Sequence, residues 1–568
     1  MFNQGKKSHK RAEIGPSPSD ACGEQNSPQA SPQPQAKGAA SCIAPIIPAF
    51  ALALVAFAVY FNALSGAFVS DDGGQILANP WIKHLGNIPK AFSTNVWGFQ
   101  WAGTSNYYRP LMHCVYTLTY QLFGLNPIGF HLVNVLFHCG VTVLVFLIVR
   151  QLLPRSQATP VWLSAPFLAA LLFATHPIHT EDVAWVAALP DVAFTFFYLL
   201  SFYLYSRSRA VASRGYLFSL ACFTVAVLFK EPALTLPVVL LAYDRTCREE
   251  RFSLLESIGR YGPYFIVGAG YLALRIRALG GVAPYKTTTL SSYEVVINLF
   301  PFVFRYLEKL LLPIDLNYIF VVHPLTSLLE GKALISVSVT AVVVILALFA
   351  LKRNKLAFLG IVFVVVPLLP ALDIPALGEY PFAERYLYLP SVGFVFLLAL
   401  FLSWAEKSSP KGARAIAAGF LLLATTYAIG TVRRNHVWQS DYDLWTDTVA
   451  KSPDSAWAHD RLGMAYRHRK MPVEAIQQYQ AAIALKPNSD DDHNNLAAVY
   501  EDLGMTNEAL GEIQIAIAID PTNAAAHHNL GVLYNKIGMK NNARIELTTA
   551  LSLKPDDESA RRLLGETP

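Results

Sequence analysis

Apolar and polar stretches alternate along the first three quarters of the chain with the spacing of membrane helices. Runs long enough to cross about 30 Å of hydrocarbon recur from Ile43 to about Gly430, and the sequence is polar from there on. We predict about eleven spans, near 43–64, 128–150, 161–176, 190–206, 215–230, 232–244, 258–279, 333–351, 356–372, 386–404 and 411–431. The pattern therefore predicts an all-α chain that begins with a polytopic membrane helix bundle.

The polar part repeats itself with a period of 34 residues. The positions that recur are Leu462, Leu496 and Leu530; Tyr466, Tyr500 and Tyr534; Ala475, Ala509 and Ala543; and Pro487, Pro521 and Pro555. This pattern is typical of tetratricopeptide repeats, in which each unit is a pair of antiparallel helices. Pro453 lies one period before Pro487, so the segment DYDLWTDTVAKSPDS supplies a half-repeat. Stacked units of this kind form a curved α-solenoid with a concave groove.

Three parts are expected from these patterns. Residues 1–42 are polar and rich in Pro and Ser, which predicts a disordered cytoplasmic tail. Residues 43–431 form the membrane domain, and residues 432–568 form an extracytoplasmic domain of a half-repeat and three repeats.

Positive charge predicts the orientation of the spans. The basic residues Lys6, Lys7, Lys10 and Arg11 near the start of the chain precede the first span and are expected to hold this end in the cytoplasm. With eleven spans, the later basic clusters all fall on that side: Arg150 and Arg155; Arg207, Arg209 and Arg214; Arg245, Arg248 and Arg251; Lys352, Arg353 and Lys355; and Lys407, Lys411 and Arg414. Segments 110–124 and 295–313 are moderately apolar and are predicted as interfacial helices on the outer surface, because counting them as spans would place Arg150 or Lys352 outside. The repeats then lie outside.

Composition agrees with a membrane protein. The chain is 53% hydrophobic and 15% charged, which is too apolar for an ordinary soluble enzyme of 568 residues. Its six cysteines show no CxxC spacing, so neither a zinc site nor a disulfide framework is indicated. The net charge of +5 is interpreted as membrane topology and not as nucleic-acid binding.

Four outward turns carry ionisable side chains at the edge of the predicted membrane. They are FVSDDGG (68–74), THPIHTEDVAW (175–185), FKEPALT (229–235) and PFAERYLYLPS (381–391). Ionisable groups at membrane depth cost roughly 2.5–3.5 kcal/mol each, so they normally face a protein interior or a water-filled cavity and mark function. Four such turns on one side predict one shared site.

Each turn also has a simpler structural interpretation. Asp71 and Asp72 are suited to capping a helix. His176 and His179 have a spacing that could ligate a metal with Glu181, but Pro177 disrupts the helix that would align them, which favours structural hydrogen bonds.

The remaining two turns have simple interpretations as well. Lys230 and Glu231 could form a local ion pair at a helix end. Glu384 and Arg385 could anchor a helix at the interface, although a guanidinium beside tyrosines is well suited to a phosphate. Only the convergence of all four turns favours a catalytic site.

The motifs together resemble a known family. FVSDDGGQILANPWI, YYRPLMHCVYTLTYQLFGLN, FHLVNVLFH, LFATHPIHTEDVAWVAALPD, LFKEPALTLP and AERYLYLPSVGF, in this order and followed by tetratricopeptide repeats, resemble the transmembrane and tetratricopeptide-repeat-containing O-mannosyltransferases. More broadly, the arrangement is similar to the class C glycosyltransferase fold. The resemblance implies a sugar donor linked to polyprenyl or dolichyl phosphate, and Ser or Thr hydroxyls of translocated proteins as acceptors.

The resemblance also implies roles for the residues of the four turns. Asp72 or Asp71 would be the catalytic base of an inverting displacement, with Asp72 slightly preferred. Asp191 and Glu181 would complete the catalytic wall. The acceptor or sugar hydroxyls would be oriented by His176, His179, Glu231 and Glu384, and the lipid phosphate would be held by Arg385, Arg109 and Lys230. A divalent metal is compatible with this many carboxylates, although the related O-mannosyl branch resembles metal-independent chemistry, and no cofactor is assigned.

One motif departs from the family pattern. The family commonly carries Gly-Arg-x-Asp where this chain reads ALPD, so Asp191 is kept while the preceding arginine is absent. If that arginine steadies the donor phosphate, then Arg109, Arg385 or Lys230 must compensate here. This departure leaves the donor specificity open.

The repeats are expected to bind the acceptor polypeptide. Asn495 and Asn529 stand just before the marker leucines, with Arg461 at the equivalent position of the first repeat. Asparagines at this position resemble the ladder of the nucleocytoplasmic N-acetylglucosamine transferase, whose amides grip extended peptide backbones. The alternative is ordinary solvated polarity on a helix.

Three other classes compete with this interpretation. A transporter or flippase predicts charges near the bilayer midplane and a repeat that relates the two halves of the membrane region, and the membrane region shows neither pattern. A repeat scaffold anchored in the membrane needs only one span. A transferase that acts on a glycan or lipid differs only in its acceptor. The lack of an N-x-S/T sequon and the short array favour a bacterial inner membrane with periplasmic repeats over an endoplasmic reticulum membrane.

Overall fold

Helices form the framework of the protein in the computed structural model. The structure describes residues 45–100, 105–153, 159–248, 252–281, 290–373 and 380–566, and these ranges contain no β-strand. Within them the prediction of an all-α fold is confirmed. The tail predicted at residues 1–42 lies outside the described residues.

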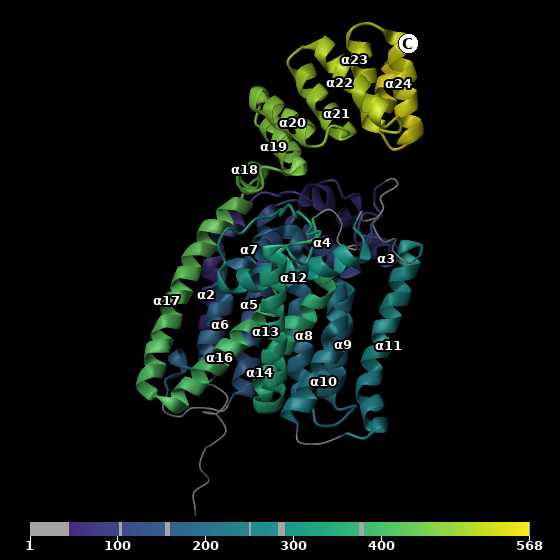
Figure 1. Cartoon of the computed structure of the whole chain (residues 1–568). Coiled ribbons are helices and arrows are strands. Elements are labelled where there is room, and N and C mark those ends of the chain that lie inside the picture. Colours follow the sequence, from purple (N-terminus) through teal and green to yellow (C-terminus); the bar gives the residue numbers. More distant parts are fainter. Residues whose placement is uncertain are drawn as a thin grey trace, which may run out of the picture. The chain divides into compact units, whose positions relative to one another are not determined.

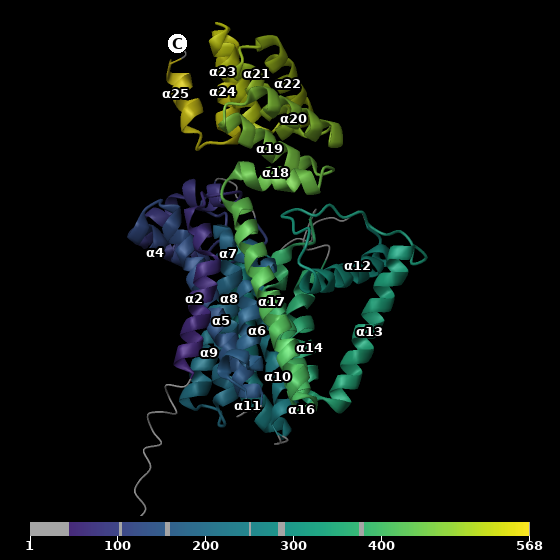
Figure 2. The same ribbon diagram turned by 90° about the vertical axis from the view of Figure 1, so that its left-hand side faces the viewer.

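A helix is found at each of the eleven predicted spans (Figures 1 and 2). These are α2 (Ile46–Val59), α5 (Pro127–Leu152), α6 (Ala165–Thr175), α8 (Leu189–Arg207), α9 (Arg214–Phe229), α10 (Leu236–Cys247), α11 (Leu254–Leu279), α13 (Gly331–Arg353), α14 (Lys355–Leu368), α16 (Pro390–Ser408) and α17 (Pro410–Asn435).

Within the described ranges, six helical stretches are long and apolar enough to cross a membrane. They are Pro127–Leu152, Val186–Arg207, Gly331–Arg353, Lys355–Leu372, Pro390–Ser408 and Pro410–Trp438, and the helices α2, α6 and α9 are apolar but shorter. The chain is therefore an integral membrane protein. The total of eleven spans stays a prediction, because α10 has only 12 residues and α11 carries charged side chains such as Glu256 and Arg275.

Two further helices lie where interfacial helices are predicted. They are α4 (Pro110–Phe123) and α12 (Ser292–Leu311). Figure 2 shows α12 running across the direction of α13 and α14. Ser291 begins α12 with a capping box, in which its hydroxyl accepts from the Glu294 N–H and the Glu294 carboxylate accepts from the Ser291 N–H. A helix in this orientation can line a site at the end of the bundle.

The polar turn between α6 and α8 is buried inside the protein and is not exposed to solvent. It consists of η6 (Pro177–His179), α7 (Thr180–Ala184) and η7 (Val186–Ala188), and every residue of these elements is buried. Prolines stand at the starts of η6 and α8, where a missing N–H costs nothing. The sharp turns let one short segment present several acids to the interior.

Helices α14 and α16 pack with their backbones in close contact at Gly393. A Cβ at this position would lie 2.6 Å from the carbonyl oxygen of Gly360 and 2.7 Å from the amide nitrogen of Val364. Backbone atoms cannot move aside as a flexible side chain can, so any larger residue must push the two helices apart.

We therefore expect Gly393→Ala to destabilise the membrane domain by about 1–3 kcal/mol. The measurement is the thermal midpoint of the purified protein in detergent. Gly419→Ala in α17 is the matched control, since its Cβ would meet nothing within 4 Å. An equal midpoint for the two variants would contradict the close packing of α14 on α16.

The C-terminal helices pair as the 34-residue period predicts. The elements are α18 (Asp441–Lys451), α19 (Ala456–His468), α20 (Pro472–Leu485), α21 (Asp490–Asp502), α22 (Thr506–Ile519), α23 (Ala524–Lys536), α24 (Lys540–Leu553) and α25 (Glu558–Glu566). Helices α19–α24 form three antiparallel pairs, α18 packs on α19 as the half-repeat, and α25 packs on α24. The short η11 (His436–Trp438) joins α17 to this array.

Candidate active site

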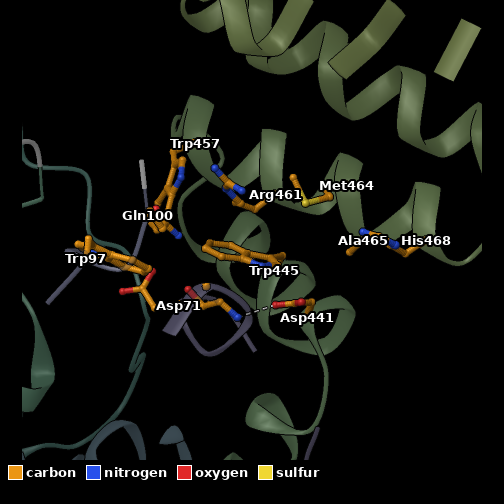
Figure 3. Close-up of a pocket in the computed structure, with 12 residues that line it drawn as sticks. Asp71, Trp97, Gln100, Asp441, Trp445, Trp457, Arg461, Met464, Ala465 and His468 are labelled. Atoms are coloured by element: carbon orange, nitrogen blue, oxygen red, sulfur yellow. Dashed lines mark hydrogen bonds between the residues drawn. The ribbon is translucent and has the colours of Figure 1, made fainter. Parts of the chain in front are cut away.

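Two cavities meet at Asp71, between the loops at one end of the helix bundle and the start of the repeats. The first has a volume of about 500 Å³ and the second about 480 Å³, and both are lined by Asp71, Trp457 and Arg461. Figure 3 shows the first cavity, with Asp71 among Trp97, Trp445 and Trp457. The lining of the second cavity also includes Arg385, Tyr107, Tyr318 and Tyr380.

The backbone at Ser70 orients the two acids that follow it. Ser70 has a φ of 53°, which few residues other than glycine adopt. Its N–H donates to the Asp441 carboxylate at 2.8 Å, and its hydroxyl lies 2.9 Å from the Tyr318 hydroxyl. These two contacts hold the strained residue in place, so the loop after α2 has one defined course.

Asp72 points into the protein and serves as a structural link. Its side chain is fully buried, one carboxylate oxygen accepts from the Val69 N–H at 3.0 Å, and the other accepts from the Ala187 N–H at 2.7 Å. Burial raises its pKa well above the ordinary aspartate value. Both carboxylate oxygens already accept backbone hydrogen bonds, so the geometry favours Asp71 over Asp72 as the base, against the slight preference from the sequence.

Asp71, unlike Asp72, lines both cavities. Its side chain keeps access to solvent, and no described residue donates a hydrogen bond to its carboxylate. The surrounding walls nevertheless desolvate the group and raise its pKa, while Arg385, Arg461 and Arg109 lower it in part. A carboxylate with a raised pKa and free lone pairs is suited to accept a proton.

Arg385 is fixed by Glu181 at the wall of the second cavity. The Arg385 Nη1 donates to Glu181 Oε1 at 2.5 Å, and the Arg385 backbone N–H donates to Glu181 Oε2 at 3.1 Å. Glu181 is completely buried, whereas a quarter of the Arg385 side chain is exposed. The buried acid therefore orients a guanidinium whose remaining N–H groups are available to an anion.

Two more cations of the predicted site also have acidic partners. Lys230, which ends α9, donates to Asp191 in the first turn of α8, and both side chains are buried. The Lys230 ammonium lies 5.4 Å from the ring centre of Tyr386, the residue after Arg385. Arg109, at the start of α4, lies 3.6 Å from Glu231. The predicted acids and bases thus come together as three pairs.

The two histidines and Glu384 have structural partners. His176 Nε2 lies 3.2 Å from the Leu310 carbonyl oxygen, and His179 Nε2 lies 2.8 Å from the Ser391 hydroxyl. Glu384 accepts from the Asn317 N–H at 2.6 Å and lies 3.5 Å from Arg434. These three side chains are completely buried and none lines either cavity, so the structure does not place them where they could touch an acceptor.

The repeat positions are only partly available for a peptide. The Asn495 amide donates to Asp460 at 2.8 Å, and the Asn529 amide donates to Asn494 at 2.9 Å. Each of these amides therefore already serves as a link between neighbouring repeats. Arg461 is different, because it lines both cavities and lies 3.3 Å from Asp460.

Sequence reasoning gave no role to several residues that belong to this site. Trp97, Trp445 and Trp457 line the first cavity, and Asp441 holds Ser70. Tryptophan is one of many apolar residues in a membrane protein, so nothing in the sequence distinguished these three from the rest. Asp441 and Trp445 belong to the half-repeat, whose only signal was the 34-residue period.

Asp182 is the second buried acid of the turn between α6 and α8. Its carboxylate is fully buried, and neither oxygen has a hydrogen-bond partner among the described residues. Burial raises its pKa well above the ordinary value, and the nearby Asp191 and Glu181 raise it further. Its adjacency to Glu181 was the only signal in the sequence.

No group of three or more His, Cys, Asp or Glu side chains is placed to hold a metal ion in the part of the chain that the structure describes. Glu181, Asp191 and Glu231 are instead paired with Arg385, Lys230 and Arg109. Among the described residues, Asp71 is the one acid that lines both cavities.

Comparisons with known proteins agree with the resemblance seen in the sequence. A family model described as dolichyl-phosphate-mannose-protein mannosyltransferase matches residues 109–259, and tetratricopeptide-repeat models match residues 474–504 and 524–557. Protein O-mannosyl-transferase F38B6.6 of Caenorhabditis elegans is 26% identical over 80% of this chain, and protein O-mannosyl-transferase TMTC1 of Homo sapiens is 28% identical over 78%. The predicted similarity to the O-mannosyltransferases with tetratricopeptide repeats is confirmed.

The chain aligns with only part of the length of each relative. The aligned region spans 64% of the nematode relative and 55% of the human one. Among solved structures, ArnT from Cupriavidus metallidurans bound to undecaprenyl phosphate is 14% identical, with a TM-score of 0.38, over 86% of this chain and 81% of that chain.

Proposed function

We propose that this protein is a membrane glycosyltransferase that moves a sugar, mannose in the first instance, from a polyprenyl- or dolichyl-phosphate donor to Ser or Thr hydroxyls of proteins. The observation that carries the proposal is the shared cavity, in which a proton-accepting carboxylate, Asp71, and an anion-binding guanidinium, Arg385, line the same space. Sugar transfer from a phosphate needs these two functions together.

The reaction proceeds as a single displacement. The acceptor hydroxyl oxygen attacks the anomeric carbon of the sugar while its proton passes to Asp71. The bond between the anomeric carbon and the phosphate oxygen breaks on the opposite side, and its electron pair leaves with the lipid phosphate. Arg385, oriented by Glu181, stabilises the negative charge that develops there. The configuration at the anomeric carbon is inverted.

The other two ion pairs support the donor end of the site. Arg109 lies over the ring of Tyr107, with 4.4 Å between the guanidinium carbon and the ring centre, and Tyr107 lines the second cavity with Arg385. Lys230 is tied to Asp191 and lies over Tyr386. We infer that these cations compensate for the arginine that is missing before Asp191. The polyprenyl tail remains in the lipid while the acceptor enters from water.

The acceptor approaches along the first repeat. The cavities extend from Asp71 past Trp457 and Arg461 of α19 to Asp491 and Asp492 at the start of α21. This continuous path supports an extended polypeptide as the acceptor and disfavours a small glycan. We place the site and the repeats outside and the N-terminus in the cytoplasm, in a bacterial inner membrane, with the endoplasmic reticulum membrane as the alternative.

The proposal is tested by supplying the purified protein in nanodiscs with polyprenyl-phosphate mannose and a Ser/Thr-rich peptide. Transfer is read as a gain of one hexose by mass spectrometry, and the linkage is assigned by digestion with α- and β-mannosidases of known specificity. Parallel reactions offer a lipid or an oligosaccharide as the acceptor, and polyprenyl-phosphate glucose as the donor. Transfer to the lipid or oligosaccharide but not to the peptide would overturn the proposed acceptor.

We expect the rate of transfer to depend on pH through Asp71. The base must be ionised to accept a proton, and its pKa is raised by burial. Activity should therefore be lost as the pH falls, and the midpoint of this loss should lie at a higher pH than an ordinary aspartate shows. The measurement is kcat/KM for the peptide between pH 4 and 8. A rate that does not change over this range would contradict the assignment.

A further inference from the structure

A third cavity lies under α12, away from the candidate active site. It has a volume of about 340 Å³ and is lined by α12, by the segment 321–325 and by the first two turns of α13. Its described lining shares no residue with either of the cavities at Asp71. The ring of Phe382 lies between the two regions, since it lines the second cavity and is 5.5 Å from the Arg305 guanidinium of the third.

Arg305 is a cation without an anionic partner in this cavity. Its guanidinium lies 5.5 Å from the ring centres of Phe320 and Phe382, and it makes no hydrogen bond or ion pair with any described residue. Burial lowers its pKa, and this effect exceeds the opposing effect of Glu308. The group stays charged, because an arginine cannot be deprotonated in a protein. Its five N–H donors are therefore available to an anion.

The other ionisable groups leave the cavity with positive charge. Lys332, in the first turn of α13, lines it and forms no ion pair with a described residue, and Glu330, an acid that interacts with it electrostatically, lies outside the lining. His323 also lines it but lies 3.0 Å from Asp454. Among the described residues of the lining, Glu308 is the one acid. Two cations against one acid favour the binding of an anion.

The walls of the cavity indicate that this anion is attached to hydrocarbon. Phe302, Leu325 and Ile335 contribute apolar surface to the lining. Ile335 belongs to α13, which is long and apolar enough to cross a membrane and of which only 11% of the most apolar window is buried. An acyl or prenyl chain therefore has an apolar surface to follow directly from the cavity.

We propose that this cavity binds the phosphate headgroup of a membrane lipid, with the phosphate at Arg305 and Lys332 and the hydrocarbon along α13. The site is separate from the donor site at Arg385. A free phosphate ion would satisfy the two cations but would leave the apolar surface of α13 unused. Guanidinium groups bind phosphate through two parallel hydrogen bonds, which a lysine cannot reproduce.

The test measures lipid binding to the full-length protein carrying Arg385→Gln, so that the proposed donor site does not contribute. The protein in neutral phosphatidylcholine nanodiscs receives phosphatidylglycerol, polyprenyl phosphate or inorganic phosphate. Bound lipid is counted by native mass spectrometry, and the thermal midpoint is followed in parallel. We expect saturable binding of one or both lipid phosphates, and the comparison of the two identifies which lipid is preferred.

Arg305→Gln is expected to weaken this binding by about tenfold, which corresponds to the loss of one charge-assisted hydrogen bond or more. Lys332→Gln should weaken it by a smaller factor, and Arg305→Lys should retain part of it. Lys83→Gln, on the outer loop after α2, removes one exposed cation elsewhere and is the matched control. Lys332 is exposed on the helix surface, so its variant keeps the test valid even if Arg305→Gln folds poorly.

Two outcomes would overturn the proposal. One is equal lipid binding by the parent and by both the Arg305→Gln and Lys332→Gln variants. The other is displacement of the lipids by millimolar inorganic phosphate, which would make the cavity a site for the free ion. Neither outcome bears on the proposed transferase activity, because that activity depends on Asp71 and the wild-type Arg385.

Discussion

Asp71→Asn is expected to lower the rate of sugar transfer by at least about a hundredfold, because general-base catalysis by a positioned carboxylate contributes roughly 10²–10⁴ to a rate. The asparagine fits the same space but cannot take the proton. Since the Asp71 carboxylate accepts no hydrogen bond from a described residue, the fold should not change. The measurement is kcat with saturating donor and peptide, together with the thermal midpoint.

Asp72→Asn is the matched control, one residue further along. Its amide would have to replace a carboxylate that accepts from both the Val69 and Ala187 N–H groups, and the NH₂ would face one of these donors. We expect a loss of about 1–3 kcal/mol in the free energy of unfolding. A variant pair in which Asp72→Asn stops transfer at full stability while Asp71→Asn remains active would reverse the two roles.

Arg385→Gln is expected to reduce kcat/KM for the lipid-linked donor by about a hundredfold or more, since the guanidinium would no longer stabilise the leaving phosphate. Glu181→Gln should reduce kcat/KM for the donor by a smaller factor than Arg385→Gln does, because it removes the orienting charge and leaves the guanidinium in place. The effects of the two substitutions should not add, since Glu181 acts through Arg385. The measurement is kcat and KM for the donor in the two single variants and the double variant.

The neighbouring pair of Glu384 and Arg434 provides the control for that cycle. Burial raises the pKa of Glu384 to about 8, and its carboxylate holds the Asn317 N–H. Glu384→Gln should therefore alter the thermal midpoint and leave the KM of the donor unchanged. Additive effects of Arg385→Gln and Glu181→Gln on the donor would show that the two residues act independently.

The positions of the helices could be predicted because each depends on a local pattern. Apolar runs located α5, α13 and the other membrane helices, and the 34-residue period located the helix pairs of the repeats. The polar positions of the loops indicated one common site. Membrane insertion and repeat stacking both impose rules on the sequence that do not depend on distant contacts.

The detailed arrangement of the site could not be predicted, since neighbours in sequence point apart. Glu384 and Arg385 are adjacent, yet Glu384 lies near Arg434, and Arg385 binds Glu181 from the turn after α6. In the same way, Lys230 pairs with Asp191, and not with Glu231 beside it. A local ion pair of Lys230 with Glu231 was the simpler interpretation from sequence, and the structure instead pairs Lys230 with Asp191 and Glu231 with Arg109.

The choice between Asp71 and Asp72 depended on a single backbone angle. Ser70 has a positive φ, and Asp441 and Tyr318, more than 200 residues away, hydrogen-bond to its N–H and hydroxyl. No local pattern around a Ser-Asp-Asp sequence predicts such a conformation. Long-range tertiary contacts decide which of the two carboxylates is available for chemistry.

The hydrogen bond between Ser70 and Asp441 limits where the repeats can be exchanged. Helix α18 is attached to the membrane domain by Asp441 at Ser70, by Lys451 at the Leu316 carbonyl oxygen and by Ser452 at Asn317 and the Ile319 carbonyl oxygen. A chimera that exchanges repeat arrays to redirect the proposed transferase to other substrates should therefore be joined after Ser452. A junction at the end of α17 would release the loop that carries Asp71, and we expect such a chimera to lose the proposed activity whichever repeats it receives.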